Sequence, residues 1–133
     1  MLFAISISGC GVAYQMKRDE LLKTATIEEY GPKPPSNHRD IEQQIINSVL
    51  KDPDSAKFQS WNDGYTTIIQ SGLGSPTPML VWMTSVDVNA KNSYGGYTGY
   101  KTWYFAWSNG RIVATGSPDS TTSGTYYTNW NYM

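Results

Sequence analysis

The chain is poor in cysteine, histidine and charge for its length. Its 133 residues include one cysteine, Cys10, and one histidine, His38, and charged residues make up 16% of the total. A single cysteine excludes an internal disulfide and a cysteine-rich zinc site. The net charge of −1 gives no electrostatic footprint for nucleic acid, so we expect no nucleic-acid partner.

The sequence also lacks the motifs that carry common enzymatic chemistry. It has no phosphate-binding loop, no nucleophile elbow and no EF-hand spacing. Asp52, Asp54 and Ser55 are typical of the turn that ends a helix. His38 stands near the start of a helix, where we expect it to be exposed. We therefore predict a protein that is not an enzyme and that uses no cofactor and no metal.

No run of about 18 apolar residues occurs, so the sequence predicts no membrane-spanning helix. What is abundant is aromatic side chains, at 14% of residues. Tyr and Trp crowd the second half of the chain, whereas most charges lie in the first half. Together with many Thr, Ser, Asn and Gly residues, this composition is typical of a β-rich surface module.

The first ten residues form a short apolar segment that ends in Cys10. The run Ile7-Ser8-Gly9-Cys10 has the pattern of a bacterial lipobox, in which a peptidase removes the preceding segment and the cysteine thiol receives a diacylglycerol. Cys10 is therefore the candidate lipidation residue. We expect an outer-membrane lipoprotein of the bacterial cell envelope, facing the periplasm or the cell surface, with the lipid anchor as its membrane contact.

This signal departs from the usual form in two ways. No basic residue precedes Lys17, and the apolar run 2–7 is shorter than the usual stretch of about 7–15 residues. Two alternatives to a signal that starts at Met1 follow: a start upstream of Met1, or an apolar N-terminal strand with a buried cysteine.

The rest of the chain divides into three parts by composition. Residues 11–35 are polar, form a weak helix or a tether, and end in the proline-rich run 31–35. Residues 36–116 carry the patterns of a folded domain. The tail, 117–133, is polar with scattered aromatics, and it is a free end, an added edge strand or a segment that docks on a neighbour.

One helix and four strands are predicted within the domain. Residues 36–51 place isoleucines and other apolar residues on one helical face, after Ser36 or Asn37 as the cap. Strands are expected at 65–70, 80–89, 100–107 and 111–115, the last two joined at an Asn109-Gly110 hairpin. Trp103, Phe105 and Trp107 share a strand face and are expected in the core. The fold class is thus α+β, with one main helix on an antiparallel sheet of about four strands and an extended N-terminal tether.

The segment between the two central strands is the candidate binding site. Glycines 95, 96 and 99 permit unusual backbone conformations, and flat tyrosine rings suit a protein or glycan partner. The candidate binding residues are Asn89, Lys91, Asn92, Tyr94, Tyr97 and Tyr100. The alternative is a broad turn whose tyrosines cover the sheet edge and whose asparagines satisfy the backbone.

Two segments resemble a known group of proteins. The runs LKDPDSAKF at 50–58 and VNAKNSYGGYTGYK at 88–101 are similar to those of small, uncharacterised bacterial envelope proteins, many with lipoprotein signals. The resemblance extends over about residues 30–113. It implies an α+β domain on a lipid tether and no catalytic activity.

These observations predict a non-enzymatic envelope lipoprotein with a binding or structural role. Its partner would be an envelope protein or a glycan, contacted through the Tyr/Gly-rich loop. The alternative is a subunit of an extracellular filament or phage virion, in which the uncharged aromatic tail mediates self-assembly by strand addition.

Overall fold

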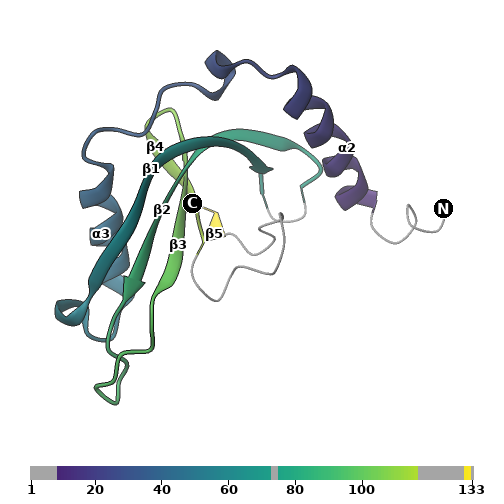
Figure 1. Ribbon diagram of the computed structural model, residues 1–133. Helices are drawn as coiled ribbons and strands as arrows, with labels where there is room; N and C mark the ends of the chain where they lie inside the picture. The colour runs from purple at the N-terminus through teal and green to yellow at the C-terminus, as the bar shows by residue number, and fades with distance from the viewer. Residues whose placement is uncertain (1–8, 73–74, 117–130, 133) are drawn as a thin grey trace.

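A computed structural model describes residues 9–72, 75–116 and 131–132, with side chains from residue 12 onward in the first two ranges. Its centre is an antiparallel meander of four strands, β1 (Lys57–Gln70), β2 (Pro78–Asn89), β3 (Lys101–Ser108) and β4 (Arg111–Gly116). The helix α3 (His38–Val49) lies against this sheet, and α2 (Gly9–Thr24) lies beyond its far end (Figure 1). The predicted α+β class with an antiparallel sheet is confirmed.

The strand predictions are confirmed with changed lengths. The segment predicted at 65–70 is the last part of β1, which begins at Lys57. β1 and β2 extend past β3 and β4 and curve over toward α2 (Figure 1). The hairpin at Asn109 and Gly110 forms as expected, with φ angles of 53° and 77° at the two residues, as a tight two-residue turn requires.

Of the two alternatives for residues 11–35, a weak helix or an extended tether, the structure has a helix over the first part, because residues 9–24 form α2. This stretch is rich in Leu, Lys, Glu, Arg and Met and contains no proline, so local propensity favours a helix. The helix is also attached to the sheet, because the buried Tyr14 donates its hydroxyl to the carbonyl of Ile68 at 3.2 Å. A one-turn 3-10 helix, η1 (Ile27–Tyr30), follows it.

The proline-rich segment after η1 is extended, but the sheet holds it in place. The indole N–H of Trp82 donates to the carbonyl of Gly31 at 3.1 Å, and the Lys33 ammonium lies 5.9 Å from the Trp82 ring centre. A buried indole needs an acceptor, and this carbonyl supplies it. The segment therefore runs along the domain instead of leading freely away from it.

Helix α3 covers one face of the sheet with an apolar core. Ile46 on the helix packs with Trp82, Val86, Phe105 and Trp107 of the strands, and Trp103 packs at the edge of this cluster. The core role expected for Phe105 and Trp107 is confirmed, whereas Trp103 is only partly buried against the same cluster. The helix is shorter at both ends than predicted, and Asn37 at its N-cap makes no side-chain cap hydrogen bond.

The opposite sheet face is also apolar. Val81 and Met83 of β2 are buried there with Ala106 of β3 and Ala114 of β4. Both faces of β2 are thus removed from water, which the alternation of a one-sided strand does not predict. Beside β4 lies a two-residue strand, β5 (Asn131–Tyr132), so an added edge strand is confirmed for these two tail residues. The predictions for residues 1–8 and 117–130 fall outside the described residues.

The packing of α3 can be tested at Ile46, which is 0% exposed. We expect Ile46→Ala to lower the free energy of unfolding by about 3 kcal/mol, because it removes apolar contact and leaves a cavity. Urea denaturation gives the value. Val49→Ala is the control on the same helix, since Val49 is 61% exposed, and we expect a change within about 0.5 kcal/mol. Equal losses at the two positions would contradict the packing described.

Candidate functional site

The loop between β2 and β3 is held in shape by its own polar groups. The side-chain oxygen of Asn92 accepts hydrogen bonds from the backbone N–H groups of Tyr94 and Gly96, at 2.9 and 3.1 Å. Lys91 and Tyr97 form an isolated antiparallel bridge across the loop. Asn89 accepts the N–H of Gly99 at 3.1 Å. The loop therefore has a defined geometry and is more than a connection between strands.

A second set of contacts ties this loop to the turn that follows α3. The hydroxyl of Ser55, in the 3-10 turn η2 (Pro53–Ser55), accepts the N–H of Lys91 at 2.9 Å. The carbonyl of the same residue accepts the hydroxyl of Tyr97 at 3.0 Å. The two segments singled out in the sequence, 50–58 and 88–101, are thus in direct contact. The interpretation of Asp52, Asp54 and Ser55 as a turn is confirmed.

The three tyrosines of the loop have different surroundings. Tyr97 is bonded to Ser55, and the Lys57 and Lys91 ammonium groups lie 4.6 and 5.6 Å from its ring centre. Tyr97 therefore has a structural role, as the alternative interpretation of the loop expected for its tyrosines. Tyr94, at the tip, is 95% exposed, and Tyr100 is 42% exposed. A large ring so fully in water, on a loop of fixed shape, is available to a partner.

A groove of about 670 Å³ lies beside the loop, between the C-terminal end of α3 and the sheet. Its apolar surface comes mainly from Ile45, Val49 and Leu50 on the helix side and from Val88 and Trp103 on the strand side. Lys91 and Asn92, two of the predicted binding residues, also line it. The size is within the usual range of small-molecule sites.

The structure brings most of the predicted site residues together. Lys91 and Tyr97 are both hydrogen-bonded to Ser55, and Asn89 and Asn92 hold the backbone of the same loop. Cys10 belongs to the first turn of α2, and its side chain lies outside the described part of the chain. α2 and the loop lie toward opposite ends of the molecule (Figure 1).

Sequence reasoning missed a buried polar cluster beneath α3, and its expectation for His38 is wrong. His38 is 6% exposed, and its Nδ1 lies 2.6 Å from a carboxylate oxygen of Glu42, which is fully buried. The same oxygen accepts the hydroxyl of Thr84 at 2.9 Å, and Thr84 accepts the indole N–H of Trp107 at 3.0 Å. The i,i+4 spacing of His38 and Glu42, on the same helical face as the isoleucines, is the sequence signal that could have found this pair.

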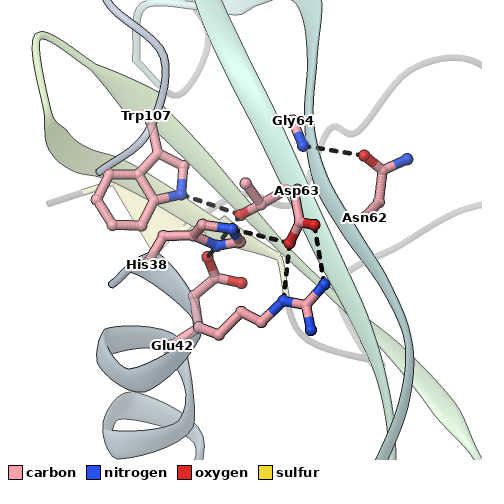
Figure 2. Close-up of polar contacts among 8 residues, drawn as sticks. His38, Glu42, Asn62, Asp63, Gly64 and Trp107 are labelled. Carbon is pink, nitrogen blue, oxygen red and sulfur yellow. Dashed lines mark hydrogen bonds and ion pairs between the residues drawn. The ribbon is translucent and has the colours of Figure 1, made fainter. Parts of the chain in front are cut away.

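Asp63 closes the outer side of the cluster. Its carboxylate lies 2.9 Å from Nε2 of His38 and binds the Arg39 guanidinium through two hydrogen bonds of 2.8 Å. Figure 2 shows the imidazole between the carboxylates of Glu42 and Asp63. Two carboxylates thus contact a single imidazole, and the guanidinium binds the outer carboxylate.

Two register shifts in β1 bring Asp63 to this face. They fall between Gln59 and Asn62 and between Asn62 and Tyr65. The second shift includes Gly64, whose φ of +144° is unfavourable for other residues, and a Cβ there would lie 3.4 Å from the Trp82 ring. Bulges of this kind redirect side chains locally. Strand alternation read from the sequence does not predict them.

The protonation of the cluster follows from its hydrogen bonds. Burial raises the pKa of Glu42, and the hydrogen bonds from His38 and Thr84 oppose this effect. The hydrogen bond from Arg39 lowers the pKa of Asp63, so Nε2 of His38 carries a proton and donates it to an ionised carboxylate.

The cluster is suited to joining α3 to the sheet. Thr84 is fully engaged between Glu42 and Trp107, and both nitrogens of the imidazole have partners. The second oxygen of Glu42, Oε1, is buried and has no hydrogen-bond partner among the described residues. In the same part of the chain, no group of three or more side chains is arranged to hold a metal ion.

Across residues 9–72, 75–116 and 131–132, no helix has the length and apolar character that crossing a bilayer requires. Comparison of the chain with protein-family models, curated proteins and solved structures finds no match.

The raised pKa of Glu42 predicts a pH dependence of stability. Above the ordinary value of 4.5 and below the raised pKa, the Glu42 carboxyl is more protonated in the folded chain than in the unfolded chain. The free energy of unfolding therefore falls as pH rises from about 4.5. We expect Glu42→Gln to flatten this decline, which urea denaturation at a series of pH values measures. Glu28→Gln, at an exposed position in η1, controls for the change in net charge. If the free energy of unfolding depended on pH in the same way in the wild type and in Glu42→Gln, the raised pKa of Glu42 would be contradicted.

Proposed function

We propose that the protein is a non-enzymatic lipoprotein of the bacterial cell envelope that is anchored through Cys10 and binds a partner through loop 89–101. The observation that carries the binding role is the loop itself. Its backbone is fixed by Asn89, Asn92 and Ser55, while the Tyr94 ring at its tip is 95% exposed. A rigid aromatic side chain loses little conformational entropy on binding, so it suits contact with an envelope protein or a glycan.

The placement of the two ends supports this proposal. Cys10 lies at the start of α2, and α2 lies toward the opposite end of the molecule from the loop (Figure 1). An acyl chain on Cys10 would hold the α2 end at the membrane surface. The loop would then face away from the bilayer, where a partner can reach it.

The polar cluster under α3 supports a role without catalysis. His38 and Glu42 are buried and bonded to other members of the cluster. A general base must reach the proton of a bound substrate. These two groups instead join the helix to the strands.

The anchor can be tested by metabolic labelling with a radioactive fatty acid. Expressed in a bacterium from the gene with its upstream sequence intact, the wild-type chain should incorporate label and fractionate with membranes. Cys10→Ser should lose both properties, because the serine hydroxyl does not replace the thiol in the acylation. A wild-type chain without label would remove the anchor from the proposal.

The loop can be tested with the unacylated Cys10→Ser protein and isolated bacterial envelopes. We expect saturable binding, which adding Tyr94→Ala weakens by about tenfold or more, as for an aromatic hot spot. Ile27→Ala is the matched control, since Ile27 is also an exposed apolar residue but lies on η1. Equal affinity of the Tyr94→Ala and control proteins would contradict a role for the tip of the loop in binding.

A further inference from the structure

Few bulky side chains fill the groove beside the loop. On the loop side it is lined by the small residues Ala90, Thr98 and Gly99. On the helix side Val49 is 61% exposed, although it belongs to the apolar face of α3. The apolar stripe of the helix therefore extends past the part of the sheet that covers it, and an unpaired apolar surface results.

The charged residues that line the groove all have the same sign. They are Lys51, Lys91 and Lys101, which come from the segment after α3, the loop and the start of β3. A fourth ammonium, on Lys57, lies close by over the Tyr97 ring. Within the described residues, none of these four lysines forms a salt bridge. For a chain of net charge −1, this is a local concentration of lysines without ion-pair partners among the described residues.

We propose that the groove binds the carboxylate form of a long-chain fatty acid. The acyl chain lies along Ile45, Val49, Leu50, Val88 and Trp103, and the carboxylate meets the lysines. Charge complementarity favours an anionic head, and the five apolar side chains favour a body without polar groups, while Asn92, Thr98 and Thr115 complete the lining. An acidic peptide satisfies the charge but brings backbone amides that the apolar lining leaves without partners.

This site goes beyond the proposed function and is independent of it. It requires neither acylation of Cys10 nor the exposed ring of Tyr94, which does not line the groove. The two proposals therefore fail separately. Loss of envelope binding in Tyr94→Ala leaves fatty-acid binding unchanged, and a chain without lipid label still binds a fatty acid.

Isothermal titration calorimetry tests the site with sodium dodecanoate, below its micelle concentration, and the full chain. We expect saturable binding that strengthens by about fourfold for each methylene added toward tetradecanoate, the factor that burial of a methylene gives. Methyl dodecanoate, which has no charge, should bind about tenfold more weakly. No saturable binding of dodecanoate, or equal binding of acid and ester, would overturn the proposal.

Exposed lysines give variants that leave the core intact. Lys51→Gln with Lys101→Gln should weaken dodecanoate binding by about tenfold. Lys17→Gln with Lys23→Gln, at exposed positions on α2, makes the same change of charge and should leave the affinity unchanged. Equal effects of the two pairs would show general charge attraction and contradict the site.

Nuclear magnetic resonance locates the ligand and separates it from a peptide. Dodecanoate should shift the amide signals of Val49, Leu50 and Lys91 and the indole signal of Trp103. A footprint elsewhere on the domain would overturn the proposal. So would a glutamate-rich peptide that binds the same groove more tightly than dodecanoate, because the occupant would then be an acidic peptide.

Discussion

The packing of α3 against the sheet is the constraint on which the other features depend. Ile46 supplies the apolar part of this contact, and the bonded series from His38 through Glu42 and Thr84 to Trp107 supplies the polar part. A buried carboxylate is costly unless its partners are in place, so this series allows few other positions of the helix. Apolar packing alone tolerates small shifts of one surface over another. The hydrogen bonds of the polar series depend on direction, so they restrict such shifts.

The candidate site follows from where that helix ends. Because α3 stops at Val49, the turn at 53–55 reaches the base of loop 89–101, where Ser55 binds both Lys91 and Tyr97. The groove lies in the angle between the helix end and the strands. The fixed loop, the exposed ring of Tyr94 and the lysine-lined groove are thus consequences of one packing arrangement. The loop lies at the end of the sheet opposite to α2 (Figure 1), and its residues Lys91 and Asn92 line the groove.

Much of the fold could be predicted from local sequence patterns. The apolar face of α3 and the Asn109-Gly110 turn each depend on residues close together in the chain, so they can be inferred from it. The β1 bulges cannot, because they depend on which residues lie opposite in β2. Nor can the contact between His38 and Asp63, because the two residues are far apart in the sequence. Within the site, Asn92 and the glycines indicated an ordered loop, but nothing local showed that Tyr97 folds back onto Ser55 while Tyr94 does not.

The sequence by itself determined the α+β class, the positions of one helix and four strands, and the loop that stands out between the two central strands. Hydrophobic periodicity and turn chemistry depend on residues that are close together in the chain, so both can be recognised in the sequence alone. Only the tertiary structure decided that 9–24 is a helix attached to the sheet, that a histidine and a glutamate lie buried under α3, and that three lysines from separate segments line one groove. Each of these depends on contacts between distant residues, whose geometry exists only once the chain has folded.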